Sequence, residues 1–247
     1  MAYHILVYLE IALALPTFVV LRFIPAPYGR QARGGWGPAI PARLGWVVME
    51  SPAPLVFLAV YWTGARPLRL VPLLFLGAWL THYLYRTYVY PFLLRPGRRL
   101  PVLIVLLAVT FNTLNGYVNA HWVASVGDYP VGWLADPRFL AGIALFAGGL
   151  ALNGQSDRVL RGLRKPGETG YRIPHGWAFD RVSSPNYLGE IVEWTGWALA
   201  TWSLAGLAFA IYTTVNLAPR ALTHHTGYRQ QFPDYPQRRR ALVPYLL

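Results

Sequence analysis

Residues 3–24 read YHILVYLEIALALPTFVVLRFI, an apolar run that contains one glutamate and a late arginine. Its length matches the roughly 20 residues that an α-helix needs to cross a bilayer. A signal peptide is the alternative, but a positive charge is missing before the run and a small-residue cleavage site is missing after it. We therefore predict a retained transmembrane helix.

Six further apolar runs extend this interpretation along the chain. They lie at about 44–63, 69–94, 102–126, 138–160, 187–203 and 204–222. The last two form one stretch that must break near Ser203 or Gly206, unless it is a long tilted or re-entrant element. The pattern predicts an all-α, polytopic integral membrane protein with about seven transmembrane helices in a single domain, residues 1–247.

The composition agrees with this fold class. Of 247 residues, 55% are hydrophobic and only 13% are charged, which is too few charges to cover a soluble globule of this size. The absence of cysteine excludes disulfides, thiolate metal sites and a cysteine nucleophile, and we predict no metal site. Arginine supplies 21 of the 22 basic residues, which indicates a GC-rich, bacterial coding sequence and hence the bacterial inner membrane. In a eukaryote the equivalent location is the endoplasmic reticulum membrane.

The basic residues are scattered between the apolar runs, which favours a topological role for them and argues against a nucleic-acid partner. With the N-terminus outside, 18 of the 22 fall on the cytoplasmic side, in keeping with the positive-inside rule. The C-terminus is then cytoplasmic. We expect the polar stretch at residues 161–186 to form a functional cytoplasmic loop that closes over a ligand together with the tail from residue 223. No obligate protein partner is evident.

Two polar side chains inside the second and third runs are candidates for catalysis, because an ionisable group in a bilayer is costly unless it faces a cavity or a partner. Glu50 precedes Pro52 and Pro54, which weaken the helix and favour a pocket. Tyr83 falls at a similar depth, so the two can meet. A carboxyl in an apolar site can stay protonated, and the pair would then donate two hydrogen bonds to a carbonyl oxygen that becomes an enolate. The alternatives are a Tyr–Glu hydrogen bond between helices and, for Glu50, an ion pair with Arg86 or a capping role at the kink.

Helical periodicity sorts other polar residues of these runs onto faces. On the third run it groups an arginine with two tyrosines, namely Tyr83, Arg86 and Tyr90, and it points His82 and Tyr85 elsewhere. On the fourth run it aligns three asparagines, Asn112, Asn115 and Asn119. Such an asparagine stripe either joins helices by hydrogen bonds or forms the polar wall of a cavity, and the spacing alone favours neither.

The end of the fifth run carries polar residues that share one face: Asn153, Asp157, Arg161 and Arg164. An acceptor beside basic groups at the membrane edge suits a nucleotide, with the aspartate for hydroxyl or amide groups and the arginines for phosphate. The alternative is a solvated helix end with an internal Asp–Arg pair, which for this segment alone is the better explanation.

The entrance of the sixth run adds carboxylates to the same edge. Ser184 and Pro185 are expected as N-cap and first helical residue, and the polar residues that follow about one turn apart are Asn186, Glu190 and Glu193. The last run adds basic and donor groups every four residues, namely Arg220, His224 and Tyr228. The motifs HExxH, the Walker loop and a strand-linked GxGxxG are missing, which excludes a zinc protease and the soluble Rossmann and P-loop nucleotide sites.

Several ordered motifs of this chain resemble the 3-oxo-5α-steroid 4-dehydrogenases, or steroid 5α-reductases, over close to its whole length. They are PAPYGR at 25–30, MES at 49–51, THYLYRTYVYP at 81–91, DRVLRGLRKPGETGYRIPHGWAFDRVSSPNYLGEIVEWTGWALATWS at 157–203 and DYPQRRRALVPYLL at 234–247. The resemblance implies a seven-span helical enzyme that reduces the Δ4 double bond of a 3-oxo-steroid, or of a similar flat enone lipid drawn from the membrane, with NADPH.

The same resemblance implies roles for individual residues. Glu50 and Tyr83 would bind the 3-keto oxygen of the steroid. The residues implied for NADPH are Arg98, Asn153, Asp157, Arg164, Tyr171, Arg172, Asn186, Glu190, Arg220, His224 and Tyr228. The chain departs from animal members of the family after residues 224–225, where Thr226 and Gly227 replace a longer His-rich run, and this puts the nucleotide contacts of the last helix in doubt.

Two other functions compete with this one. The RVSSPNYLGE segment also resembles the isoprenylcysteine carboxyl methyltransferases, membrane enzymes that use S-adenosylmethionine. That group gives no reason for the pairing of Glu50 with Tyr83. A non-catalytic lipid-binding or transport protein would need neither the basic face nor the carboxylates at the entrance of the sixth run.

Overall fold

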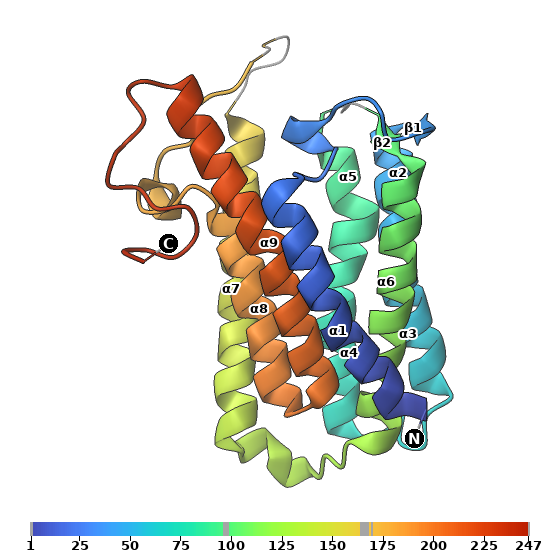
Figure 1. Cartoon of the computed structure of the whole chain (residues 1–247). Coiled ribbons are helices and arrows are strands. Elements are labelled where there is room, and N and C mark those ends of the chain that lie inside the picture. Colours follow the sequence, from blue (N-terminus) through green and yellow to red (C-terminus); the bar gives the residue numbers. More distant parts are fainter. Residues whose placement is uncertain (1, 96–98, 164–167, 169, 247) are drawn as a thin grey trace.

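The computed structural model of the chain describes residues 2–95, 99–163, 168 and 170–246, and it is a bundle of helices (Figure 1). The α-helices are α1 (Ala2–Phe23), α2 (Ala42–Glu50), α3 (Pro52–Trp62), α4 (Leu70–Leu84), α5 (Tyr90–Leu93), α6 (Val102–His121), α7 (Pro137–Gly162), α8 (Pro185–Thr201) and α9 (Leu204–Gln231). Two-residue strands β1 (Ala39–Ile40) and β2 (Leu100–Pro101) pair antiparallel at one end of the bundle. Short 3₁₀ turns lie at Gly29–Gln31, Val131–Ala135 and Trp177–Asp180.

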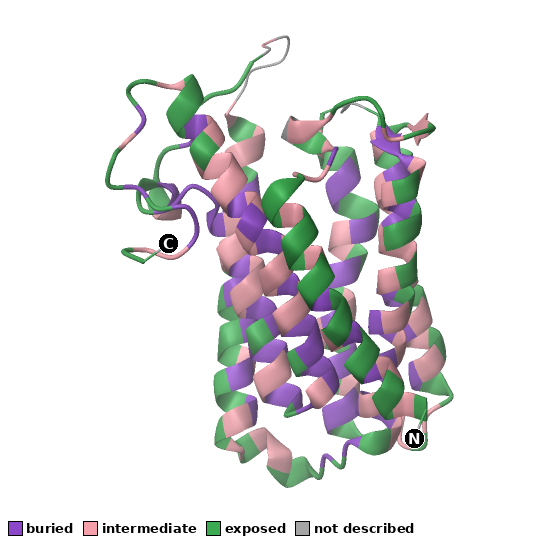
Figure 2. Ribbon diagram, in the orientation of Figure 1, coloured by how far each residue is buried: buried purple, intermediate pink, exposed green. Residues whose placement is uncertain are grey.

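The predicted all-α class is confirmed, and each of the predicted runs coincides with helix. Four described segments are long and apolar enough to cross a membrane: Ala2–Phe23, Ala42–Trp62, Val102–Val126 and Pro137–Gly162. Large apolar side chains such as Leu15 and Phe23 are exposed on α1, and Figure 2 shows this exposed stripe along the outer side of the helix. Such a stripe suits contact with lipid.

Two of the apolar runs are not regular α-helix throughout. In the second, α2 ends at Glu50 and α3 begins at Pro52, because Pro52 and Pro54 have no N–H to donate. The third contains a π-helical turn, Tyr85–Val89, between α4 and α5. Such wider turns shift the side chains that follow relative to the regular helical spacing. His82 precedes this turn, and although the spacing points it away from the Tyr83 face, it is itself buried in the bundle.

The break between the last two spans lies where it was predicted. Trp202 adopts a left-handed conformation with φ of 45° and ends α8. Ser203 then caps α9, and its hydroxyl accepts a hydrogen bond of 2.8 Å from the N–H of Gly206. The helix α9 runs nine residues beyond the predicted end at 222, because the polar turn that follows is still helical.

Glycines bring α7 and α8 into close contact. A Cβ atom at Gly149 would lie 2.3 Å from the backbone nitrogen of Glu193, and one at Gly189 would lie 2.5 Å from that of Asn153. Gly142 and Gly196 approach the facing helix as closely. Because only glycine permits this approach, these glycines set the separation of the two helices that carry Asn153, Asp157, Asn186 and Glu190.

Candidate active site

Arg86 is the centre of a buried polar layer that joins three helices. Its Nη1 donates to Oδ2 of Asp157 at 2.9 Å, and its Nη2 lies 3.8 Å from Oε2 of Glu190. The guanidinium also lies 4.5 Å from the ring centre of Tyr90. The π-helical turn places Arg86 opposite α7 and α8, and the close packing of those two helices brings both carboxylates within its reach.

Two amides extend this layer. Nδ2 of Asn186 lies 3.4 Å from Oδ1 of Asp157, and Nδ2 of Asn153 donates to the Asn186 carbonyl at 3.0 Å. Asp157 is only 1% exposed, and its ion-pair partner is Arg86 on another helix. The alternative of a solvated helix end with an internal Asp–Arg pair is therefore wrong. Arg161 lies 3.4 Å from the Tyr85 hydroxyl.

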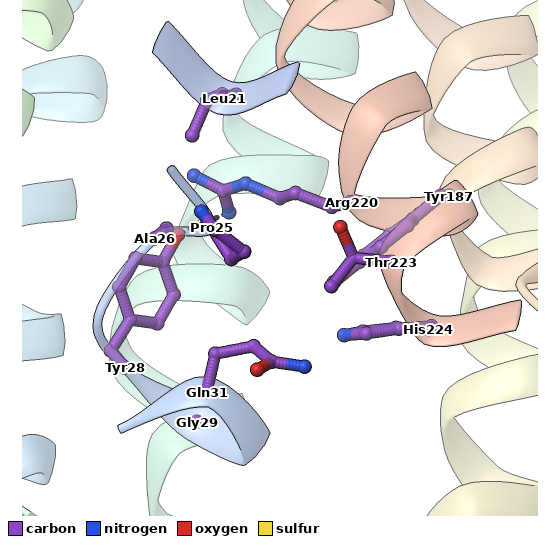
Figure 3. Close-up of a pocket in the computed structure, with 10 residues that line it drawn as sticks. All are labelled: Leu21, Pro25, Ala26, Tyr28, Gly29, Gln31, Tyr187, Arg220, Thr223 and His224. Carbon is purple, nitrogen blue, oxygen red and sulfur yellow. Dashed lines mark hydrogen bonds between the residues drawn. The ribbon is translucent and has the colours of Figure 1, made fainter. Parts of the chain in front are cut away.

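Beside this layer is a pocket between the segment after α1 and the C-terminal half of α9 (Figure 3). Arg220 donates to the Tyr28 hydroxyl, and its guanidinium lies 5.0 Å from the ring centre of Tyr28. The rings of His224 and Tyr187 are 5.5 Å apart. The residues lining the pocket are Leu21, Pro25, Ala26, Tyr28, Gly29, Gln31, Tyr187, Arg220, Thr223 and His224.

The remaining predicted nucleotide ligands lie apart from these two groups. Tyr228 is stacked on Tyr235 with ring centres 5.4 Å apart. Arg172 forms a surface ion pair of 2.9 Å with Glu168, and Tyr171 is exposed. None of these lines the pocket described above. Arg98 and Arg164 lie outside the described residues.

Glu50 and Tyr83 lie near the polar layer around Arg86, whose charge acts on Glu50. Tyr83 is 4% exposed and packs against the rings of Trp79 and Trp194, with centres 4.9 Å and 5.6 Å away. It interacts electrostatically with Glu50. Within the described part of the chain, neither the Glu50 carboxyl nor the Tyr83 hydroxyl has a hydrogen-bond partner, and the ion pairs of Arg86 go to α7 and α8. The Tyr–Glu hydrogen bond is thus not formed, and the Arg86 charge acts on Glu50 without an ion pair within 4 Å.

The comparisons with known proteins agree with this arrangement. Residues 98–247 match the family described as 3-oxo-5-alpha-steroid 4-dehydrogenase. The chain is 45% identical to the Bos taurus 3-oxo-5-alpha-steroid 4-dehydrogenase 1, with 98% of this chain and 96% of the bovine protein covered. It is 42% identical to the Homo sapiens enzyme of that name, covering 98% and 94%. Its identity to the Arabidopsis thaliana steroid 5-alpha-reductase DET2 is 43%, covering 94% and 91%.

The chain belongs to the 3-oxo-5α-steroid 4-dehydrogenase family. As a member of this family it is an oxidoreductase, and its apolar helices fit a membrane protein. The non-catalytic alternative is therefore wrong. The full-length similarity also favours the reductase over the methyltransferase, whose resemblance rests on one short segment.

Sequence reasoning missed one buried contact of this reductase. Nδ1 of His82 lies 2.8 Å from Oε1 of Glu193, and both side chains are buried beside Tyr83 and Trp194. A histidine in an apolar span needs a polar partner, and this requirement was the available signal. Helical spacing placed His82 on another face than Tyr83, but it could not give the partner of His82 on α8.

Two further predictions concern polar side chains, one at the start of α8 and one along α6. Ser184 and Pro185 do occupy the N-cap and first position of α8, but the Ser184 side chain makes no capping hydrogen bond. The asparagine stripe mostly joins helices. Nδ2 of Asn112 donates to the Met49 carbonyl at 2.7 Å, and Oδ1 of Asn119 accepts from Nε1 of Trp197 at 2.8 Å.

The C-terminal tail folds back onto the loop before α8. The Ser183 hydroxyl lies 2.7 Å from Nδ1 of His225, 2.6 Å from the Tyr235 hydroxyl and 3.0 Å from the Arg240 carbonyl. Burial, followed by the nearby positive charge of Arg229, lowers the pKa of the His225 imidazole below its ordinary value. The tail and loop predicted to act together are thus in direct contact.

Proposed function

We propose that this reductase uses NADPH to reduce the Δ4 double bond of a 3-oxo-Δ4-steroid and releases the 5α-reduced 3-oxo-steroid. One observation carries the proposal: Glu50 and Tyr83 are electrostatic neighbours in the bundle interior, and neither has a hydrogen-bond partner among the described residues. The names of the relatives support a steroid as the substrate class. The ketone oxygen of an enone has two lone pairs, so it can accept one hydrogen bond from Glu50 and one from Tyr83.

The donor pair would lower the barrier to hydride addition. Bound NADPH supplies a hydride to the β-carbon of the enone, and the π electrons move onto the ketone oxygen. The Glu50 carboxyl, in its protonated form, and the Tyr83 hydroxyl donate hydrogen bonds to that oxygen as its negative charge grows. Water or Tyr83 then supplies the proton that the α-carbon takes up. The packed rings of Trp79 and Trp194 exclude other water from the enolate.

The polar residues near the arginine layer and the pocket fit a dinucleotide. Nε of Arg220 is buried without a hydrogen-bond partner among the described residues, as expected of a group that awaits an anion. Arg220 and His224 would hold phosphate. Asp157 and Glu190 would accept from hydroxyl or amide groups, with Asn153 and Asn186 beside them. We extend the nucleotide site to Arg98, Arg164, Tyr171, Arg172 and Tyr228 on the strength of the family resemblance.

Cofactor and substrate are tested together with the purified, detergent-solubilised protein. We expect testosterone to be converted to its 5α-reduced product with NADPH and more slowly with NADH, because arginines outnumber carboxylates at the site and suit the additional 2′-phosphate. The preference should weaken as salt is raised, since partly exposed phosphate contacts are screened. S-adenosylmethionine should not bind. Equal kcat/KM for the two cofactors at low ionic strength would contradict the NADPH assignment, and lack of product would contradict the reaction.

We further propose a single reductase domain with seven spans, an outside N-terminus and a cytoplasmic C-terminus, in the inner membrane of a bacterium. In this topology the loop at residues 161–186 and the tail from residue 223 close over the nucleotide. Single cysteines test this, because the chain has none. His175→Cys in the loop and Gln237→Cys in the tail are at exposed positions, whereas Ser183 is buried and unsuitable. An impermeant maleimide should label both only from the cytoplasmic face of sealed vesicles, and labelling from the other face would contradict the topology.

A further inference from the structure

The π-helical turn Tyr85–Val89 leaves the backbone carbonyl of Arg86 without its usual donors. The N–H of Tyr90 donates to the Tyr85 carbonyl, one residue earlier than in a regular α-helix. The next residue, Pro91, has no N–H to donate. The Arg86 carbonyl therefore lacks the backbone donor that an α-helix would supply and also the one that a π-helix would supply. A side chain from another helix can take their place.

Trp46 of α2 is the side chain that donates to this carbonyl. Its Nε1 lies 3.3 Å from the Arg86 carbonyl oxygen, and the Arg86 guanidinium lies 5.4 Å from the centre of its ring. Trp46 comes four residues before Glu50 on α2. Arg86 comes three residues after Tyr83 on the other helix. Because both intervals are about one helical turn, the contact joins the two helices of the donor pair close to both donors.

The same π-helical turn contacts the chain a second time, just after Glu50. The Tyr88 hydroxyl donates to Oγ of Ser51 at 3.2 Å, and Ser51 in turn donates to the Val47 carbonyl at 2.6 Å. The two contacts therefore enclose Glu50, one of them a turn before it and the other one residue after it. In the part of the chain that the structure describes, the Glu50 carboxyl has no hydrogen-bond partner. Its position thus depends on the backbone that carries it.

We propose that Trp46 and Tyr88 are positioning residues, which fix the helix of Glu50 relative to that of Tyr83 so that both donors reach one ketone oxygen. Groups of this kind must be held within about 0.5 Å of their productive positions. A misplacement of about 1 Å can lower a rate by about 10². Trp46 and Tyr88 act on the donors through the backbone and need no contact with the substrate. This inference rests on the proposed reductase function, which gives the donor pair its ketone.

The test is Trp46→Phe, which keeps an aromatic ring beside Arg86 and removes the N–H donor. We expect kcat for testosterone reduction with NADPH to fall about tenfold, because the helix of Glu50 is held less firmly. KM for the steroid and Kd for NADPH should stay within about twofold of the wild-type values, since no binding group is removed. Wild-type kcat in Trp46→Phe would overturn the inference. A higher KM with unchanged kcat would also overturn it, because Trp46 would then be a substrate-binding residue.

Trp133→Phe is a matched control at the other end of the bundle, in the connection between α6 and α7 (Figure 1). Nε1 of Trp133 donates to the Ala200 carbonyl at 3.0 Å, and the Arg138 guanidinium lies 4.5 Å from the centre of its ring. The substitution removes the same kind of contact, so it should lower the thermal stability to a similar extent without changing kcat. An equal loss of kcat in the two variants would show a general loosening of the bundle and overturn the inference.

The Glu50→Ala background separates positioning from a general effect on the fold. Because the group that Trp46 holds in place is absent there, adding Trp46→Phe should lower the single-turnover rate by less than about twofold further. An equal fractional loss with and without the Glu50 carboxyl would overturn the inference.

Tyr88→Phe keeps the inference testable should Trp46→Phe not fold. It removes one hydroxyl at the surface and should lower kcat about threefold, by the same loss of positioning. Wild-type kcat in Tyr88→Phe would then overturn the inference and leave the proposed function standing. Failure of the wild-type protein to reduce testosterone would overturn the proposed function and this inference with it.

Discussion

The α7–α8 side of the molecule and the side around Glu50 and Tyr83 treat buried polar groups in opposite ways. Between α7 and α8, glycines bring the backbones together, and Asp157 is paired with Arg86 at 2.9 Å. Around Glu50 and Tyr83, the described structure provides charged neighbours such as Arg86 but no hydrogen-bond partner for either side chain. We propose that the first side is a rigid frame that holds the cofactor and that the second leaves its polar groups available to the substrate.

The largest effect on stability is expected from removing the buried ion pair between Arg86 and Asp157 on the α7–α8 side. Asp157→Asn removes the carboxylate that lies 2.9 Å from Arg86 and leaves its charge in the interior with Glu190 at the longer distance of 3.8 Å. We expect a loss of about 3–5 kcal/mol in unfolding free energy, because one member of a buried pair is left uncompensated. Thermal unfolding in detergent measures it.

A matched pair on the surface provides the control for this prediction. Asp128 also lies 2.9 Å from an arginine, Arg69, but its side chain is 70% exposed. Asp128→Asn should change stability by less than about 1 kcal/mol, because solvent screens exposed pairs. Equal losses of unfolding free energy in the two variants would show that the buried Arg86–Asp157 pair does not stabilise the protein more than a surface pair does.

The sequence could predict this frame only in part. Span positions, the break at Ser203 and the polarity of Asp157 and Glu190 follow from hydropathy and from helical spacing within one run. The ion-pair and hydrogen-bond partners of these residues cannot be predicted in this way, because a pairing such as Arg86 with Asp157 depends on how two helices are rotated relative to each other. The π-helical turn at Tyr85–Val89 changes that rotation without a clear sequence signal. The contact of His82 with Glu193 could not be predicted either, because it joins two helices, α4 and α8.

A smaller effect on stability is expected from disturbing the close contact between α7 and α8. Gly149→Ala would place a Cβ atom 2.3 Å from the backbone of Glu193, and the helices would have to separate. We expect a loss of about 1–3 kcal/mol from overpacking, together with weaker NADPH binding. At the neighbouring Gly148, nothing lies within 4 Å of such an atom, so Gly148→Ala should be neutral or slightly stabilising. If both alanines were tolerated equally, close glycine packing would not hold the frame together.

The smallest effect concerns pH and the contact between tail and loop. Because the pKa of His225 is lowered when the tail is docked, the docked form binds fewer protons than the free form, and docking weakens as pH falls below the ordinary value of 6.5. Trypsin cleavage at exposed Arg238 should therefore speed up between pH 7.5 and pH about 6, measured with the intrinsic pH dependence of trypsin on a peptide subtracted. His225→Gln should lose this dependence. The same pH response in both proteins would assign it to another group.

The central claim is that the unpaired donors on the substrate side carry catalysis while the frame binds the cofactor. Glu50→Gln and Tyr83→Phe separate these two functions when NADPH affinity and the rate of testosterone reduction are measured on the same preparations. We predict that NADPH binding stays at the wild-type value in both variants while kcat falls by about 10²–10³, the loss typical of one oxyanion donor. Wild-type turnover in either variant would contradict the account.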